Sequence, residues 1–599
     1  MNIQNKNKNT ELDVKPVQGA ELPIFESIYT PDIKPKEQKI GFILEKNELF
    51  FYKKDDSTGK IKAIPVSSRI EIIAKQSDLY SGGNAGLTLR FINMFEREIK
   101  WSIPRSSLAD DRKIITELCG LGASVYDKPL FNNYLMTANP ISDFSCVDSI
   151  GWHRYEGRKF FVLPHVTSGN HTDKDKLVYQ SNSLSTLFKS KGTTEEWRDH
   201  VGKYCGGNSR LIFAVSHGLA SMLLEPTGST NGGINLFGSS SIGKTTIARV
   251  CASLFSDPSY LLSCRTTDNA LEKTAQSHND CFLILDEAAQ MNPKTMGETA
   301  YMLGNGAAKE RMKSGGELQE VMKFRLNFML TGEIPTSQHI QEDKGQRATE
   351  GQSIRILDIP AGSNHGVFDT LHGFKTGAEF SKFLVEQSGK YYGTTFLQFI
   401  DSMLSIEDLR EKLKETKERL INALPEDLRT MEGQADRALD RFTIAAYAGE
   451  LATQFGLTGW DDGEAVWAAG VCFEAWVITR GGADNQEEKK LLQQVRDFIE
   501  THGESRFTDI TQSNNNDSKT INRAGFRELK EGEWIYYVLA VGFKEMHKGF
   551  TNVMAIKSLV EAGWLQKTRN SLGCNIASKM KKSAKHGSHR VYELNLSMR

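Results

Sequence analysis

The sequence has no excess of charge of either sign. Its 74 Lys and Arg residues stand against 75 Asp and Glu residues, which gives a formal net charge of −1. This balance excludes a uniformly basic nucleic-acid coat protein and an acidic disordered tail protein. Hydrophobic residues make up 39% of the 599 residues, enough for packed cores, and at about 100–200 residues per domain the length predicts three to five domains.

Long apolar runs are also missing. No stretch reaches the roughly 18 uninterrupted apolar residues that indicate a membrane-spanning helix, so we expect no membrane partner. The most apolar segment, 465–478, contains Glu474 and predicts a buried helix. The first residues, Met-Asn-Ile-Gln-Asn-Lys, lack the apolar run of a secretory signal, so we expect a cytoplasmic protein.

The cysteines are too scattered for a zinc site or a disulfide framework, because no two of them form a CxxC pair. They are therefore expected to be reduced, buried thiols. His153 is a possible metal ligand, but a single histidine beside Trp152 is more typical of a packed core. The eight cysteines are Cys119, Cys146, Cys205, Cys251, Cys264, Cys281, Cys472 and Cys574.

The N-terminal part of the chain divides by composition. Residues 1–38 are polar and rich in proline, which predicts a flexible leader. Short alternating runs such as 41–45 and 87–91 then predict the strands of a β-rich domain over 39–195, with one helix near 112–118.

The middle of the chain alternates between apolar strands and helical patterns. Runs at 233–237, 281–285 and 326–330 predict buried strands of a parallel α/β sheet, and we assign this domain to 196–365. Residues 366–487 have a helical pattern and are expected to form a lid on that domain.

The last 112 residues mix helices and strands. Val553, Ile556 and Val560 recur at helical spacing, and the segments 563–565 and 590–594 look like the two strands of a hairpin. A helix followed by a hairpin predicts a winged helix-turn-helix over 488–599.

The strongest motif runs from Gly238 to Thr245 and matches G-x-x-x-x-G-K-[ST] in full. It follows a predicted strand and opens a predicted helix, the context of a P-loop, whose backbone N–H groups and helix N-terminus hold phosphates. Lys244 is predicted to reach the β- and γ-phosphates of ATP, and Thr245 to bind Mg²⁺. The predicted ATP-binding residues are Gly238, Ser239, Ser240, Ser241, Ile242, Gly243, Lys244, Thr245 and Thr246.

An acidic pair ends the next buried strand. Asp286 is predicted to hold Mg²⁺ through water, and Glu287 to polarise the attacking water. The pair lies about 40 residues after the P-loop, a spacing that suits a P-loop ATPase. Thr331 ends the third strand and resembles the sensor of AAA+ ATPases, which contacts the γ-phosphate or the attacking water. Glu333 departs from the Asn that many viral helicases carry nearby.

Arginines follow that could reach a neighbouring subunit. Arg355 stands just before a predicted strand and is our first choice for an arginine that stabilises the transition state in trans, with Arg347 second. A surface salt bridge is the alternative for either residue. A trans-acting arginine requires an oligomer.

Two basic segments could bind DNA. Lys309, Arg311 and Lys313 are spaced two apart before a Ser-Gly-Gly turn, so on a strand they would share one face of a hairpin. A solvated surface hairpin is the alternative. The other segment lies where a wing would be and could contact duplex phosphates, or serve only as a solubilising tail. Its lysines are Lys579, Lys581, Lys582 and Lys585.

Together these residues resemble the helicase-like family called domain of unknown function 927, over roughly residues 40–560. The resemblance implies a ring-forming replicative helicase of a phage or mobile element, with ATPase motifs similar to AAA+ helicases of the minichromosome-maintenance and superfamily-3 type. Besides the P-loop and the acidic pair, the supporting stretches are 150–153, 279–280, 303–306, 330–333, 367–372, 448–452 and 456–460.

We therefore expect an α/β P-loop NTPase (AAA+-like) core with a helical lid, a β-rich N-terminal domain and a C-terminal winged helix. The predicted function is an ATP- and Mg²⁺-dependent DNA helicase or translocase, a homo-hexamer with a single strand in its channel and duplex at the winged helix. One alternative is an ATPase that remodels or loads a protein partner. Another is a non-hydrolysing DNA-binding regulator with a vestigial ATPase.

Overall fold

The computed structural model describes most of the chain, and it divides into two compact units. One unit holds Met1–Asp148 and Asp175–Leu184, and the other holds Ser149–Lys174 and Ser185–Arg599. The expected leader, 1–38, lies outside the described residues. Within the described part, no helix is long and apolar enough to cross a membrane. The described residues are 40–169, 176–182, 187–310, 312, 321–341, 354–429, 433–480, 486–511, 520–565, 568–569, 575–576, 578–583 and 587–596.

The first unit is rich in strands, as predicted. One antiparallel sheet has the order β1 (Gly41–Leu44), β2 (Glu48–Lys54), β3 (Ile61–Ser68). A second sheet has the order β11 (Leu177–Tyr179), β7 (Asp143–Val147), β4 (Ile70–Asp78), β5 (Gly86–Ile92), β6 (Glu98–Pro104). The side chains of Leu89, Trp101 and Phe131 are buried in its core.

Two helices accompany these sheets. The predicted helix near 112–118 is α1 (Asp111–Gly120). A second helix, α2 (Lys128–Thr137), was not predicted, although Asp127 caps it by accepting a hydrogen bond from the backbone N–H of Leu130.

The core of the second unit is the predicted parallel sheet. Its order is β13 (Leu262–Ser263), β14 (Phe282–Asp286), β15 (Asn327–Gly332), β12 (Gly232–Phe237), β16 (Ile356–Pro360), and every neighbouring pair is parallel. Residues of β12, β14 and β15 are almost all buried, which explains their continuous apolar sequences. The helices α7 (Lys244–Phe255), α8 (Asp268–Ser277) and α9 (Pro293–Asn305) lie between these strands in sequence.

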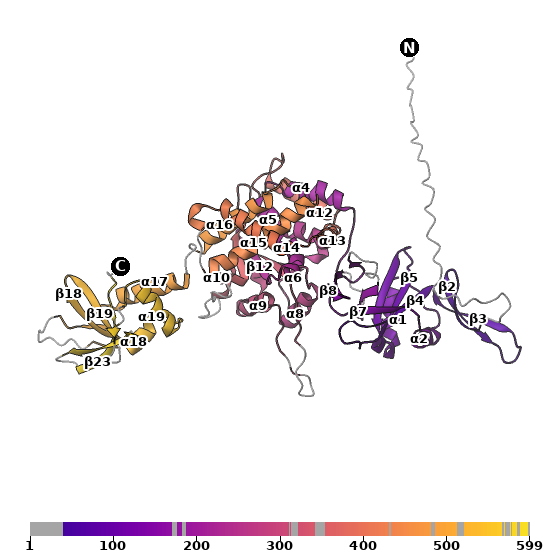
Figure 1. The fold of residues 1–599 in the computed structure, drawn as a ribbon, viewed down its shortest axis with the longest axis horizontal. Coiled ribbons are helices and arrows are strands. Elements are labelled where there is room, and N and C mark those ends of the chain that lie inside the picture. The colour runs from indigo at the N-terminus through magenta and orange to yellow at the C-terminus, as the bar shows by residue number, and fades with distance from the viewer. Residues whose placement is uncertain are drawn as a thin grey trace, which may run out of the picture. The chain divides into compact units, whose positions relative to one another are not determined.

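Helices follow the last strand of this sheet, as expected for 366–487. The predicted buried helix at 465–478 is α16, and it packs with α15 and α5 (Ser209–Ala220) (Figure 1). These helices are α12 (Gly377–Ser388), α13 (Thr395–Met403), α14 (Leu409–Ala423), α15 (Gln434–Gln454) and α16 (Glu464–Thr479).

A small sheet of β8 (Gly151–Tyr155), β9 (Arg158–Val162) and β10 (Thr167–Ser168) lies in the second unit, although we expected the N-terminal domain to run to 195. The cause is a buried polar contact. The carboxylate of Asp280 accepts the backbone N–H of Trp152 at 2.9 Å, and the side chain of Asn279 donates to the carbonyl of Ile150 at 2.7 Å. These contacts join two of the segments that carried the family resemblance.

The C-terminal part begins with α17 (Gln486–His502). Its sheet has the order β17 (Phe507–Asp509), β18 (Gly525–Lys530), β19 (Glu533–Leu539), β23 (Gly587–Leu594), β22 (Ser578–Ser583). The other helices are α18 (Ala540–Met546) and α19 (Asn552–Glu561).

This part differs from the prediction in two details. Ile556 and Val560 pack partly buried against the core, as predicted, but Val553 is 79% exposed, and the fully buried apolar residues of α19 are Ala555 and Leu559. Leu565 and Leu594 meet in a single bridge, whereas β23 forms its full ladders with β19 and β22. A helix and a hairpin are present within a five-stranded sheet, so the winged helix stays a prediction.

Candidate nucleotide-binding site

The P-loop connects the end of β12 to the start of α7. Gly243 has a φ of 111°, and a Cβ there would lie 2.8 Å from Cγ2 of Val367, so only glycine fits. The backbone N–H of Val367 donates to the carbonyl of Ile242 at 3.0 Å, which fixes the loop from outside. The predicted ATP-binding residues therefore form the loop before the 12-residue helix α7 and its first three residues, where partial positive charge favours phosphate.

Lys244 lies across this loop. Its ammonium donates to the carbonyls of Gly238 at 2.8 Å and Ser239 at 2.7 Å. Burial lowers the pKa of Lys244, whereas the negative charges of Glu333 and Asp286 oppose that shift. The ammonium is thus already placed in the loop and can exchange its two carbonyl partners for phosphate oxygens.

The acidic pair lies beside the loop because of the strand order. β15 is the neighbour of both β12 and β14, so the ends of these three strands meet at one edge of the sheet. There the hydroxyl of Thr331 donates to Oδ1 of Asp286, and the hydroxyl of Thr245 lies 3.5 Å from the same oxygen. Thr331 also accepts the backbone N–H of Glu287 at 3.2 Å. Residues about 40 apart in sequence are thereby brought together.

The donor set suits Mg²⁺. The hydroxyl of Thr245 and the carboxylate of Asp286 are hard oxygen ligands at the mouth of the loop. Mg²⁺ usually keeps several waters and takes only one or two protein ligands besides the phosphates. Among the described residues there is no group of three or more His, Cys, Asp or Glu side chains that could hold a metal. His153 is buried.

Glu287 is held in a special backbone conformation. Its φ is 63°, which is uncommon for a residue other than glycine, and Gln290 donates a hydrogen bond to its carboxylate. The side chain is exposed next to the Asp286–Thr331 pair. A carboxylate in this place can accept a proton from a water aligned with the γ-phosphate.

Three contributors to the site were not foreseen. Glu333 places a negative charge near Lys244, Gln290 orients Glu287, and Asp358 anchors the P-loop strand. Asp358 is buried and accepts hydrogen bonds from Asn235 at 2.8 Å and from the backbone of Thr336 at 2.8 Å. Burial raises the pKa of Asp358, and these hydrogen bonds oppose the shift. A sequence motif does not identify Asp358, because it acts through the neighbouring strand β12, whereas Gln290 lies only three residues after Glu287.

Arg355 lies at the amino ends of the strands of the same sheet, opposite to the P-loop. Ile356 pairs with Gly233, at the start of β12, whereas the P-loop follows Phe237 at its end. At about 3.3 Å per residue the separation is about 13 Å or more, so Arg355 does not reach the nucleotide of its own chain. Its guanidinium donates to Asn305 at 2.8 and 3.1 Å and lies 4.5 Å from the ring centre of Tyr301. Arg347 lies outside the described residues.

The basic hairpin is described only at its base. Ala307 bridges Lys323, and the N–H of Ala308 donates to the carbonyl of Met322 at 2.9 Å. Lys309 is not on a strand, contrary to the prediction. Its ammonium forms ion pairs with Glu298 at 2.5 Å and with Asp268 at 3.5 Å, and these two acids raise the pKa of Lys309.

The other predicted DNA-binding residues are described only in part. Arg311, Lys313 and Lys585 lie outside the described residues. The backbone of β22 carries Lys579, Lys581 and Lys582 and pairs with β23. Arg325, just after the hairpin, is used internally, since it forms an ion pair with Asp280.

Comparisons with known proteins agree with the fold. The family model described as "Domain of unknown function (DUF927)" matches residues 42–323. A solved structure titled "SCCmec type IV Cch - active helicase" is 14% identical, with 94% of this chain and 98% of that chain covered and a TM-score of 0.66. At this identity the likeness concerns the fold alone. NtrX from Brucella abortus in complex with ADP aligns over 39% of this chain at 13% identity, with a TM-score of 0.16, which is too low to indicate a shared fold. No curated protein matches the chain.

Proposed function

Residues 42–323 match the domain of unknown function 927 family, as the motifs indicated, and on that premise we propose that the chain is an ATP-dependent DNA helicase or translocase. One observation carries this proposal. Lys244 and Thr245 at the start of α7, Asp286 at the end of β14 and Thr331 on β15 lie at one end of the sheet, where Thr245 and Thr331 both approach the same oxygen of Asp286. The shared fold with a protein whose title names an active helicase supports the nucleic-acid part.

Each residue of the site would have its own role in the hydrolysis of ATP. The P-loop amides and Lys244 would bind the phosphates, and Thr245 and Asp286 would hold Mg²⁺, which supplies charge neutralisation between the phosphates. Glu287 would orient the attacking water. Thr331, hydrogen-bonded to Asp286 and to the backbone of Glu287, would keep these two acids in register as the nucleotide changes.

Arg355 would complete the site of a neighbouring subunit. Its position at the opposite edge of the sheet makes a role toward its own nucleotide impossible, but leaves a role in trans open. A ring of such subunits, a hexamer by the resemblance, would place each nucleotide between two chains. The hairpin that carries Lys309, Arg311 and Lys313 would then follow a single strand, and β22 with its lysines would face duplex.

The proposal is tested by ATP hydrolysis with and without single-stranded DNA. Wild-type protein should hydrolyse ATP faster when DNA is present. Lys244→Ala and Glu287→Gln should each lower the rate by about 100-fold or more, and Glu287→Gln should retain ATP binding. A wild-type rate no higher than that of Lys244→Ala would favour the DNA-binding regulator instead.

A second candidate, an ATPase that acts on a protein partner, is favoured by one observation. Lys309 is already paired with Glu298 and Asp268, so its charge is not wholly available to DNA. Charge reversal of Arg311 and Lys313 together separates the two candidates. The helicase predicts loss of DNA-stimulated hydrolysis in this variant, whereas unchanged stimulation and strand separation would favour the remodelling ATPase.

A further inference from the structure

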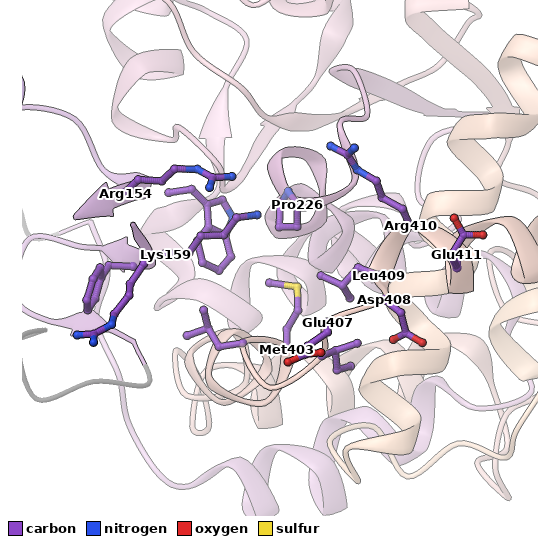
Figure 2. A pocket seen from close by; sticks show the side chains of 14 residues that line it. Arg154, Lys159, Pro226, Met403, Glu407, Asp408, Leu409, Arg410 and Glu411 are labelled. Carbon is purple, nitrogen blue, oxygen red and sulfur yellow. The ribbon is translucent and has the colours of Figure 1, made fainter. Parts of the chain in front are cut away.

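The second unit contains a cavity away from the P-loop. It has a volume of about 680 Å³ and lies between the hairpin β8–β9 and the turn that joins α13 to α14 (Figure 2). A volume of this size is typical of sites that hold a small molecule. The lining residues come from the hairpin, from Pro226 and from the segment 403–411.

The hairpin wall of the cavity is held firmly. The backbone of Trp152 is bound by Asp280, and its indole N–H donates to the carbonyl of Met222 at 2.8 Å. Lys159 forms an ion pair with Glu225 of α6 (Leu224–Thr227) at 2.9 Å. These contacts fix the hairpin to the helices beneath it, so the cavity is part of the fold.

The lining combines three kinds of surface. Its floor is apolar and includes the buried side chains of Trp152, Phe160 and Met403. One wall carries three cations of the hairpin, and Figure 2 shows Arg154 and Lys159 on that side, with Pro226 and Met403 between them and the opposite wall.

The opposite wall carries acids, but most of them are already neutralised. Asp408 pairs with Lys412 at 3.1 Å, and Glu411 pairs with Lys414 at 3.0 Å. Within the described part of the chain, Glu407 has no ion pair, and Arg410 has neither an ion pair nor a hydrogen bond. On the hairpin wall Arg154 has only a long ion pair, to Glu225 at 3.8 Å. The cavity therefore offers positive charge at Arg154 and Arg410, one carboxylate at Glu407 and an apolar floor.

We propose that this cavity is a second nucleotide site, which takes one nucleotide unit with an amino-bearing base. The phosphate would bind Arg154 and Arg410, the flat base would lie on the apolar floor, and an exocyclic amino group would donate to Glu407. Thymine has no exocyclic amino group and would bind more weakly. The unit could come from a free nucleotide or from a DNA strand, because both present the same chemistry.

This second site is independent of ATP hydrolysis, because none of its lining residues belongs to the P-loop or to the acidic strand. Mononucleotides are suitable probes for it, since the P-loop lysine acts on the β- and γ-phosphates that they lack. We would measure the binding of dCMP and dTMP, and of the hexamers dC6 and dT6, to the full chain by isothermal titration calorimetry.

The variants are Arg154→Glu and Arg410→Glu, which reverse an exposed charge on opposite walls. The matched control is Lys113→Glu, whose side chain is 80% exposed and, like Arg154, has only a long ion pair, to Asp110 at 3.6 Å. Each cavity variant should weaken dC6 by about tenfold or more, and the control should not. Thermal unfolding followed by circular dichroism verifies the fold of each variant without relying on ATP hydrolysis.

The two probes separate the sources. If both cavity variants lose the binding of dCMP, the ligand is a free nucleotide. If they weaken the binding of dC6 alone, the ligand is a DNA strand. Either result, with thymine probes bound more weakly, supports the site. If dC6 and dCMP bind the folded cavity variants as they bind wild type, or if thymine and cytosine probes bind equally, the second site is overturned, while the proposed ATPase is unaffected.

Discussion

At the residue scale, the site depends on a hydroxyl as much as on its carboxylates. Thr331 is buried, donates to Asp286 and accepts the N–H of Glu287, so it touches both acids of the pair. A carboxylate or an ammonium could not make this link, because a carboxylate only accepts and an ammonium only donates hydrogen bonds. The threonine hydroxyl does both.

Thr331→Val should therefore lower kcat for ATP by about 10- to 100-fold, since the pair loses its alignment while the P-loop stays intact. KM should change less than kcat. Thr331→Ser, which keeps the hydroxyl, should recover most of the rate in the same steady-state assay. Equal rates for the valine variant and wild type would show that the hydroxyl has no such role.

A second residue-scale property is a neutral histidine in the core. His217 is 1% exposed and packs against Phe213 and Phe282, and burial lowers its pKa to about 3 from the ordinary 6.5. The unfolded chain binds a proton at higher pH than the folded chain does. The stability contributed by the neutral ring is thus present above pH 6.5 and is lost as the pH falls toward 3.

His217→Phe should remove this dependence. Between pH 6.5 and pH 5 the wild-type protein should lose about 2 kcal/mol more unfolding free energy than the variant, measured by urea denaturation at each pH. Replacement of the exposed His365 by Phe is the control and should leave the wild-type slope. Parallel slopes for wild type and His217→Phe would contradict the assignment.

At the element scale, a buried carboxylate helps to hold the hairpin β8–β9 to the rest of the second unit. Asp280 is fully buried, with Arg325 at 2.5 Å and the backbone of Trp152 at 2.9 Å. A Cβ on Gly151 would collide with that carboxylate, so glycine is required. Burial raises the pKa of Asp280, and Arg325 opposes the shift.

Arg325→Met should leave this carboxylate without its counter-charge and lower the unfolding free energy by about 3–5 kcal/mol. Arg325→Met with Asp280→Asn should recover part of that loss, because the buried charge is gone. Urea unfolding followed by tryptophan fluorescence measures both. Lys557→Met, which removes an exposed ion pair with Glu561, is the control with an expected loss below about 1 kcal/mol. No recovery in the double variant would contradict a charge effect.

The strands themselves were easier to predict from the sequence than their order in the sheet. The apolar runs at 233–237, 281–285 and 326–330 became β12, β14 and β15, because a strand buried on both faces leaves a continuous apolar sequence. The sequence did not reveal that β15 lies between the other two, although this order creates the site. Strand order depends on packing between segments far apart in the chain.

Residue spacing also gave wrong predictions where tertiary contacts determine the position of a side chain. Of the predicted α19 stripe, Ile556 and Val560 pack against the core, but Val553 is exposed, and the helix buries Ala555 and Leu559. Lys309 was expected on a strand, but ion pairs with acids of α8 and α9 hold it. In both cases the side chain's environment, which spacing does not encode, determined the outcome.

At the scale of the whole molecule, the proposed oligomer depends on the position of Arg355. Arg355 lies at the edge of the sheet opposite to its own P-loop, so hydrolysis that depends on it must depend on a second chain. This geometry makes a mixing experiment decisive.

Lys244→Ala and Arg355→Ala should each be inactive alone. Mixed in equal amounts they should recover about a quarter of the wild-type ATP hydrolysis, because interfaces that join an intact P-loop to an intact arginine re-form. Hydrolysis is measured after the mixture has re-equilibrated. If Arg355→Ala is fully active alone, or if the mixture recovers nothing, Arg355 is not the trans-acting arginine.

Strand displacement tests the central claim most directly. Wild-type protein, ATP and Mg²⁺ are incubated with duplexes that carry a 3′ or a 5′ single-stranded tail, and release of the labelled strand is followed beside Lys244→Ala. We predict release from one of the two duplexes at a rate about 100-fold or more above that of Lys244→Ala. Release that is absent from both duplexes, or that is equal in the two proteins, would contradict an ATP-driven helicase.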